Sequence, residues 1–563
     1  MRRNSLFFLF LGLITMGLMT CTESEDPTDP NDSGTNTPPS AVISADAEIG
    51  TGTVVSLDGT GSSDPDGDDL TFAWTLMEKP GASAATLSGS ATSSAEFTPD
   101  EVGTYKVSLT VSDGSSDDTA EHSMVTEIEV LGNITEDRTL VDVIDDPTLP
   151  DYRIESDIDI SAILTIDPGV VIHADEGNIV EVQSAGVLIA TGTEADSVVI
   201  TSSDEAGDIH WGGLIINSGD SRNELTYTRI SYAGANERLY YRTALGDVFA
   251  NIGVREDAKL SVNNSLISNS GSFGLHVDYD GELNTFSDNT FADNADAAMQ
   301  MPINQFGNID SNNLFTNNGS NSVEGYGTSI ALGDDQTWTA LSGDATYHIV
   351  ADVDIHAELT ISEGVKIVLG EGVRFEVHSD GVLMSNGVET NPVIFTSADI
   401  TGGRYWTGLT IRSSDSRNVL NYTEVSYAGS DVERQYYRTA LDDVHANIAL
   451  TENARLGINN STISYGANRG IAVDYGAEFV NFQDNELSNN QDDPILIHVN
   501  AVHGVDGGTV FTSNTDDIVR VYDDNMLDAQ TWSKLSGAAA YRFMHDVDIE
   551  NDLVIEAGAR LEF

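Results

Sequence analysis

The side chains best suited to do chemistry lie in a tyrosine–arginine stretch that occurs twice. Residues 237–252 read ERLYYRTALGDVFANI and residues 433–448 read ERQYYRTALDDVHANI, so thirteen of sixteen positions are identical. Tyrosine rings can stack on the apolar face of a pyranose, and a guanidinium group can bind a carboxylate through two hydrogen bonds. The alternative is a loop that folds back onto the protein, its likeness reflecting recent duplication. The candidate ligand-binding residues are Tyr240, Tyr241, Arg242, Tyr436, Tyr437 and Arg438.

A second candidate is the acidic turn DPDGD, which places Asp64, Asp66 and Asp68 at alternate positions. Carboxylate oxygens suit Ca²⁺, which makes calcium the one candidate cofactor. The turn is not an EF-hand loop, because its twelfth position is Thr75 rather than Glu. Asp and Gly are also the residues that turn geometry favours, and we favour that simpler interpretation.

Known catalytic motifs are missing or incomplete. Asn514-Thr515-Asp516 matches the start of the polygalacturonase pattern, but His503-Gly504 precedes it and no Arg-Ile-Lys follows. The sequence also lacks His-Glu-x-x-His, Gly-x-Ser-x-Gly and a phosphate loop, so no catalytic residue is predicted. A basic residue beside clustered carboxylates in one repeat copy only would indicate an enzyme. In the tyrosine–arginine stretch, His445 in place of Phe249 is the only such break.

The N-terminus predicts export. Residues 1–20 combine two arginines with an apolar run of signal-peptide length. The following LMTC ends at Cys21 and resembles a bacterial lipobox, which implies lipidation of Cys21; plain secretion is the alternative. Residues 21–38 are rich in Pro, Asp and Ser and are expected to form a disordered tether. Their acidic start resembles the surface-export signal of Bacteroidota lipoproteins, which implies display on the outer membrane.

The composition excludes several functions. The 563 residues include 25 basic and 91 acidic side chains, a formal net charge of −66, so nucleic-acid binding is excluded. The single Cys excludes an intramolecular disulfide and a cysteine-based metal site. The acidity fits either a surface adapted to high salt or one that collects Ca²⁺. No periodic calcium motif occurs, so we favour the first and expect the fold to survive EDTA.

Residues 39–131 alternate short apolar strands with turns. Strands are expected at residues 54–57, 70–74 and 105–111. The run LDGTGSSDPDGDDLTFAW, followed later by VSDG, resembles a PKD-type immunoglobulin-like domain. This resemblance implies a β-sandwich with Trp74 between its sheets, acting as a spacer or an interaction module.

Two repeat lengths organise the remaining chain. Tyr152, Tyr347 and Tyr541 lie 195 and then 194 residues apart, so a module has about 195 residues. A shorter period of 24 fits one coil of a parallel β-helix, with apolar residues inside and Asn ladders at the turns. This period joins Ile267, Phe291 and Phe315, and also Ile463, Leu487 and Phe511. The predicted modules cover 132–344 and 345–538, and 539–563 either caps the helix or begins a third module.

A resemblance to known proteins supports the β-helix. The phrases GVLIATGT (186–193) and WGGLII (211–216) return as GVLM (381–384) and WTGL (406–409). They are similar to bacterial right-handed β-helix surface proteins of the pectate-lyase-like superfamily. That superfamily contains lyases, hydrolases, esterases and non-catalytic adhesins, so the resemblance implies a fold and no particular chemistry.

The sequence therefore predicts an all-β surface lipoprotein with a β-sandwich and a long right-handed parallel β-helix. The first functional hypothesis is a non-catalytic binding or adhesion protein that contacts glycans or other extracellular polymers. The second is a polysaccharide lyase or glycoside hydrolase with an unrecognised active site on the β-helix.

Overall fold

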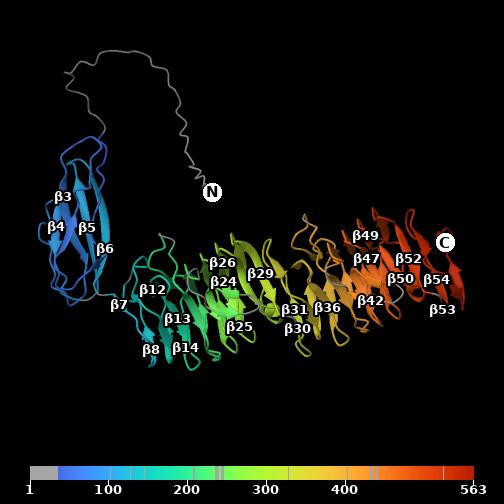
Figure 1. Cartoon of the computed structure of the whole chain (residues 1–563). Coiled ribbons are helices and arrows are strands. Elements are labelled where there is room, and N and C mark those ends of the chain that lie inside the picture. Colours follow the sequence, from blue (N-terminus) through green and yellow to red (C-terminus); the bar gives the residue numbers. More distant parts are fainter. Residues whose placement is uncertain are drawn as a thin grey trace, which may run out of the picture. The chain divides into compact units, whose positions relative to one another are not determined.

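A computed structural model of the chain describes residues 36–563 except 102, 127, 145, 207–208, 235–239, 243–245, 328, 402, 432–434, 439–441 and 524. It describes the backbone alone at residues 48, 240–242, 246–247, 436–438 and 442. The chain divides into two compact units, Met1–Thr126 and Glu127–Phe563 (Figure 1). Each unit has its own hydrophobic core.

The first unit is a small sandwich built from alternating apolar and polar residues. Its four-stranded sheet contains β1 (Glu48–Ile49), β6 (Asp117–Thr126), β5 (Gly103–Ser112) and β3 (Thr71–Glu78), and its second sheet pairs β2 (Val55–Asp58) with β4 (Ser94–Phe97). Trp74 is buried in the core between them, and its Nε1 donates a hydrogen bond to the Thr92 carbonyl at 3.0 Å. The predicted strands and the role of Trp74 are confirmed.

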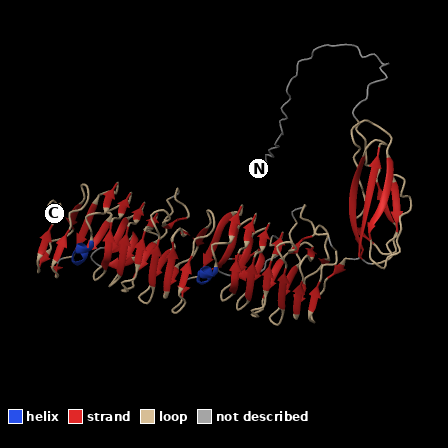
Figure 2. Ribbon diagram, turned by 180° about the vertical axis from the view of Figure 1, so that it is seen from behind, coloured by secondary structure: helices blue, strands red, loops and turns tan. Residues whose placement is uncertain are grey.

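The second unit is a parallel β-solenoid, as the 24-residue period predicted. Strands β23 (Leu266–Ser268), β26 (Thr290–Ala292) and β28 (Leu314–Thr316) stack in parallel and align Ile267, Phe291 and Phe315. Neighbouring coils are also joined by buried asparagines, because the Asn294 amide donates to Asn318 Oδ1 at 2.8 Å, 24 residues later. Figure 2 shows, within the described part of this strand-built unit, two short 3-10 helices, η1 (Ile303–Asn308) and η2 (Val499–Gly504).

Among the described residues, five sheets of six or more strands form the sides of the solenoid. The fourteen-stranded sheet contains, in order, β10 (Ile158–Ile160), β13 (Ile179–Val182), β16 (Gly213–Ile216), β21 (Ala250–Val254), β24 (Phe273–Val277), β27 (Ala297–Pro302), β29 (Ser320–Tyr326), β32 (Thr346–Ile349), β35 (Lys366–Leu369), β38 (Val393–Ser397), β41 (Thr423–Ser426), β46 (Thr462–Ser464), β49 (Glu486–Ser488) and β51 (Val510–Thr512). The ten-stranded sheet contains β30 (Ser329–Ile330), β33 (Val353–Ile355), β36 (Arg374–Val377), β39 (Gly408–Ile411), β44 (Ala446–Leu450), β47 (Arg469–Val473), β50 (Ile495–His498), β52 (Ile518–Tyr522), β55 (Ala540–Phe543) and β58 (Leu561–Glu562). An eight-stranded sheet runs from β28 to β7 (Glu129–Val130), and the six-stranded sheets run from β25 (Glu282–Ser287) to β8 (Arg138–Leu140) and from β31 (Gln336–Trp338) to β48 (Glu478–Gln483).

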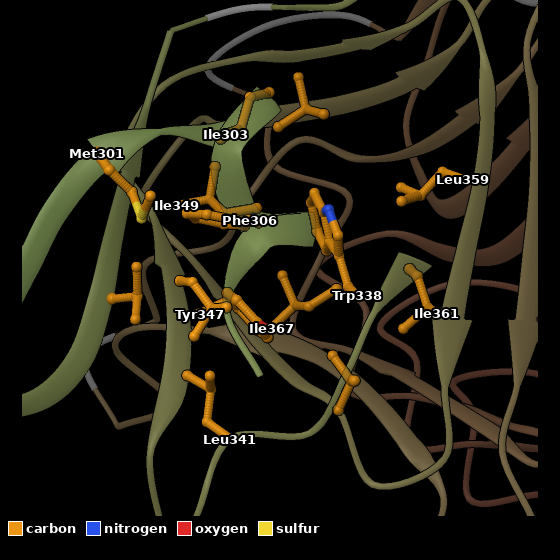
Figure 3. Packing of buried hydrophobic residues seen from close by; sticks show 14 of the residues in the cluster. Met301, Ile303, Phe306, Trp338, Leu341, Tyr347, Ile349, Leu359, Ile361 and Ile367 are labelled. Atoms are coloured by element: carbon orange, nitrogen blue, oxygen red, sulfur yellow. The ribbon is translucent and has the colours of Figure 1, made fainter. Parts of the chain in front are cut away.

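Positions 195 residues apart lie on different sheets. Asp159 is in β10 of the fourteen-stranded sheet, whereas Asp354 is in β33 of the ten-stranded sheet. Equivalent strands change from one sheet to another where β29 pairs with β32. This pairing continues the fourteen-stranded sheet, while β30 and β31 begin two new sheets. Figure 3 shows the core beside this junction, where Phe306 of η1 packs against Trp338 and Tyr347.

Candidate functional site

Three side chains that can ligate a metal meet on the outer face of the ten-stranded sheet. Asp354 on β33 is the register partner of Glu376 on β36, and His378 directly follows β36 on the same face. His378 Nε2 lies 3.0 Å from Asp354 Oδ1 and 3.8 Å from Glu376 Oε1. One candidate ligand atom from each residue fits within a 4.8 Å span. We call these three residues the carboxylate–imidazole cluster.

Two arginines contact the deepest member of this cluster. The Glu376 side chain is 4% exposed, and its Oε2 lies 3.0 Å from Arg374 Nε. Arg412, which directly follows β39, contacts the other oxygen, Oε1. Each arginine also reaches a second carboxylate, because Arg374 is 3.5 Å from Asp352 and Arg412 is 4.0 Å from Glu452. The negative charge of Glu376 is therefore balanced by two arginines that also contact other carboxylates.

A buried hydroxyl lies beside the cluster on the next coil. Thr410 on β39 is the register partner of Glu376, so the two side chains occupy the same face of neighbouring strands. Thr410 is fully buried, and its Oγ1 has no hydrogen-bond partner among the described residues. A buried hydroxyl without a partner costs free energy, which makes this position unusual.

The positions 195 residues earlier carry the same acids with different neighbours. Asp159 and Glu181 are again register partners. The Gln183 amide donates to Asp159 Oδ1 at 2.7 Å, and the Asn217 amide donates to Glu181 Oε1. The apolar Ile215 occupies the place of Thr410. Arg255 also contacts Glu181 at 3.4 Å, so both sites have a guanidinium group. The later site differs by its imidazole, its second arginine and the hydroxyl of Thr410.

The break in repeat symmetry that would indicate chemistry is therefore the imidazole of His378, since an arginine lies beside the Glu in both copies. An imidazole between two carboxylates can exchange a proton with a bound molecule or complete a metal site. The side chains of Asp354 and His378 are 24% and 30% exposed, so both functional groups are accessible from solvent.

A second feature is a column of tyrosines on successive coils. The rings of Tyr405 and Tyr427 stack with centroids 6.4 Å apart, and those of Tyr427 and Tyr465 stack at 5.0 Å with nearly parallel planes. Burial raises the pKa of Tyr427, with smaller contributions from Tyr465 and Tyr405. Tyr465 is 46% exposed, and the same turn position on the following coil holds the shorter Asn489. We call these three residues the tyrosine column.

The strands that position the column also line a polar groove. Tyr427 directly follows β41 and Tyr465 directly follows β46. The groove encloses about 360 Å³ and includes Thr423 and Glu424 of β41 and Thr462 of β46. The equivalents of the column are His210, Tyr232 and Asn269, so a tyrosine stack of three coils is absent from that set of described residues.

The twice-occurring tyrosine–arginine stretch forms a β-hairpin in each copy. Strand β19 (Tyr240–Arg242) pairs antiparallel with β20 (Gly246–Val248), and β42 (Tyr436–Arg438) pairs with β43 (Asp442–Val444). These hairpins interrupt the coils before β21 and β44. The side chains of Tyr240, Tyr241, Arg242, Tyr436, Tyr437 and Arg438 lie outside the described part of the structure, so their sugar contact stays a prediction.

Two carboxylates of the acidic turn accept hydrogen bonds from backbone amides. Asp64 Oδ1 accepts hydrogen bonds from the backbone amides of Asp66 at 2.8 Å and Asp68 at 3.3 Å. Asp66 Oδ2 accepts one from the Thr37 amide at 2.6 Å. These contacts are those of a stabilised turn, and calcium binding at Asp64, Asp66 and Asp68 stays a prediction. Cys21 lies outside the described residues.

Sequence reasoning missed both the carboxylate–imidazole cluster and the tyrosine column. The signal was present at the 195-residue offset, where Gln183 is replaced by His378 and Ile179 by Arg374. For the column, the exchange of His210 for Tyr405 carried the same kind of signal. All of these exchanges lie outside the two highly similar hairpins.

Comparisons with known proteins support the first unit. A family model for a PKD domain matches residues 44–126, which confirms the PKD resemblance there. No curated protein matches the chain. In the part of the chain that the structure describes, none of the helices has the length and apolar character needed to cross a membrane.

Two solved structures are similar to the chain only at low scores. One is a nucleoside hydrolase-related hypothetical protein from Saccharophagus degradans associated with carbohydrate metabolism, with 28% identity, a TM-score of 0.16 and coverage of 18% of this chain and 27% of that one. The other is the TibC-catalysed hyper-glycosylated TibA fragment, with 10% identity, a TM-score of 0.20 and coverage of 77% of this chain and all of that one. The chain therefore spans about a quarter of the first protein's length.

Proposed function

We propose that this protein is a non-catalytic binding protein of the cell surface that contacts glycans through its β-solenoid. The observation that carries the proposal is the tyrosine column, in which Tyr465 presents a 46% exposed aromatic side chain at the end of a stack. An aromatic face with little conformational freedom is suited to the apolar face of a sugar ring. The stack holds Tyr465 in place, so binding costs little side-chain entropy.

The polar groove at the starts of β41 and β46, the two strands that Tyr427 and Tyr465 follow, supplies further hydrogen-bonding groups. Glu424 and Thr462 offer a carboxylate and a hydroxyl group that can bond to sugar hydroxyls, whereas Thr423 is fully buried and bonds to Ser385. Glu424 and the acidic surface favour neutral or cationic glycans over uronates and sulfated chains. The ligand class that fits best is therefore a neutral polysaccharide.

We also infer the cellular setting from the sequence. A lipid on Cys21 would attach the chain to the outer membrane, residues 21–38 would act as the tether, and the PKD-like unit would act as a spacer. The solenoid would be right-handed, belong to the pectate-lyase-like superfamily and derive from duplication of a module of about 195 residues. Expression of Cys21→Ser tests the anchor: we expect loss of the protein from the membrane fraction, and unchanged membrane retention would contradict lipidation.

A glycan array with the whole chain, followed by calorimetric titration of the sugars that bind, tests glycan recognition. We expect Tyr465→Ala to weaken binding about tenfold, equivalent to about 1.4 kcal/mol. Tyr475→Ala is the matched control, because Tyr475 is a similarly exposed solenoid tyrosine outside the column, and its loss should leave binding unchanged. Failure to retain any glycan, or equal affinity of the Tyr465 variant and wild type, would contradict the proposal.

The second candidate is a polysaccharide lyase or hydrolase, favoured by the carboxylate–imidazole cluster with its two arginines. Product analysis on the same sugars separates the two candidates. Unsaturated or shortened products that disappear in His378→Gln would establish the enzyme, and binding without cleavage supports the first candidate.

A further inference from the structure

The carboxylate–imidazole cluster has the donor set of a transition-metal site. It offers one imidazole nitrogen and two carboxylate oxygens, and imidazole favours Zn²⁺, Ni²⁺ and Cu²⁺ over the hard cations Ca²⁺ and Mg²⁺. We propose that Asp354, Glu376 and His378 bind one divalent transition-metal ion of the zinc type. This site does not depend on glycan binding.

The spacing of the donor atoms fits such an ion. Metal–ligand bonds of about 2.0–2.2 Å place neighbouring donors about 3–4 Å apart. His378 Nε2 lies 3.0 Å from Asp354 Oδ1 and 3.8 Å from Glu376 Oε1. Glu376 and His378 lie on and directly after β36, and Asp354 is the register partner of Glu376 on β33. The backbone hydrogen bonds between these strands therefore fix the separation of the ligands.

The unpartnered hydroxyl of Thr410 is an independent observation at the same place. It is fully buried, next to Glu376 on the following coil, and has no hydrogen-bond partner among the described residues. A metal ion held by three protein ligands keeps open positions for water. A water molecule on the ion would give the Thr410 Oγ1 the partner it lacks, as an outer group that orients the site.

The arginines on Glu376 do not block the ion, because each has another carboxylate within reach. Arg412 can turn toward Glu452, now 4.0 Å away, and Arg374 toward Asp352, now 3.5 Å away. Binding therefore exchanges one cation for another on Glu376 without leaving a buried charge alone. At the earlier copy, Gln183 and Asn217 donate to the acids and Ile215 offers no hydroxyl, so no equivalent ion is expected there.

Calorimetric titration of the chelator-treated whole chain with ZnCl₂ tests this site. We expect one high-affinity zinc ion per chain and at least about a tenfold loss of affinity in His378→Gln and in Asp354→Asn. Gln is the natural residue at the equivalent position 183, so the His378 variant should fold normally, and circular dichroism verifies this. His348→Gln is the control, since His348 is a surface histidine beside Glu324 outside the cluster, and its removal should leave zinc affinity unchanged.

A second readout uses Co²⁺ in place of Zn²⁺. Visible absorption from Co²⁺ bound to nitrogen and oxygen ligands should appear with wild type and disappear with His378→Gln. The Thr410→Val variant should still bind the ion but with lower affinity, because only the hydrogen bond to the outer hydroxyl is lost. The proposal is overturned if the wild type binds no zinc at micromolar concentration, or if His378→Gln binds zinc as tightly as wild type.

Discussion

The outer surfaces around Glu181 and Glu376 show how two equivalent regions of one solenoid can differ while their backbones agree. In both regions an Asp and a Glu are register partners on neighbouring coils. Around Glu181 the neighbours are the Asn217 amide and one arginine, Arg255, whereas around Glu376 they are His378 and two arginines. The acids belong to the shared scaffold, and the side chains added around them distinguish the later region.

The inner surfaces of the same coils share a large buried residue. Trp211 and Trp406 are both fully buried, and the indole of each donates to the carbonyl of a serine 20 residues later, at 2.8 and 2.9 Å. Inward residues must fill the space between stacked coils, so exchange there creates cavities or strain. Outward residues contact only solvent and adjacent coils, so one region can acquire a site without altering the fold.

The largest loss of stability that would test this comparison is expected from a substitution inside the core. Trp338 packs against Phe306, Tyr347 and Phe375, all of them fully buried, and Trp338→Ala should cost about 3–5 kcal/mol of the free energy of unfolding. Its equivalent Trp532 packs on Tyr541 and the partly exposed Phe543, so Trp532→Ala should cost less. Urea unfolding followed by circular dichroism measures both.

The control for the tryptophan pair is Leu332→Ala. Leu332 is 75% exposed, so its removal should change stability by less than about 0.5 kcal/mol. If the Trp338 and Trp532 variants lose the same free energy of unfolding, or if the Trp338 variant loses no more than the control, core packing does not distinguish these two coils.

A smaller effect should be the same in both regions, because the asparagine ladders are shared. Asn294 Nδ2 donates to Asn318 and Asn490 Nδ2 donates to Asn514, both at 2.8 Å. Replacement of either by Ala leaves buried amides without partners and should cost about 1–3 kcal/mol. Asn386→Ala, at an exposed position, is the control with little expected loss. Losses at Asn294 and Asn490 that differ by more than about 1 kcal/mol would contradict a common ladder.

The spacing of apolar residues made most of the solenoid predictable. A period of 24 residues places Ile267, Phe291 and Phe315 on adjacent coils because each coil must return one apolar side chain to the same core column. The PKD-like sandwich was predictable for a similar reason, since strand alternation and turn residues are local properties. Trp74 is buried as this reasoning required.

The exchange of sheets and the carboxylate–imidazole cluster were not predictable in the same way. Repetition identifies equivalent residues, but the pairing of β29 with β32 decides on which sheet they lie. Asp354 and His378 are 24 residues apart, and only the strand register shows that their side chains meet. Local sequence patterns predict strands. Contacts between coils depend on the lengths of the turns, and the sequence does not show how small differences in these lengths shift the strand register.

The smallest effect concerns two surface turns and their response to pH. A hydrogen-bonded Arg222 side chain, aided by the Arg222 backbone amide, lowers the pKa of Asp220 to about 2, and Arg417 lowers the pKa of Asp415 in the equivalent turn. Because these folded-state values lie below the ordinary value, the ionised carboxylates stabilise the fold above about pH 4. That stabilisation is lost as pH falls through the folded pKa, near 2 for Asp220.

Asp220→Asn keeps the turn acceptor for the Arg222 amide and removes only the charge. We expect a slightly lower melting temperature than wild type at pH 7, a loss well below that of the asparagine variants because the pair is exposed and screened. Asp415→Asn should lose less, because Arg417 retains Glu358, two coils away in the sheet, at 2.5 Å. Thermal unfolding at pH 7, 4 and 2 measures the differences, which should shrink between pH 4 and 2. A difference that stays constant over that interval would show that the turn geometry, and not the charge, carries the effect.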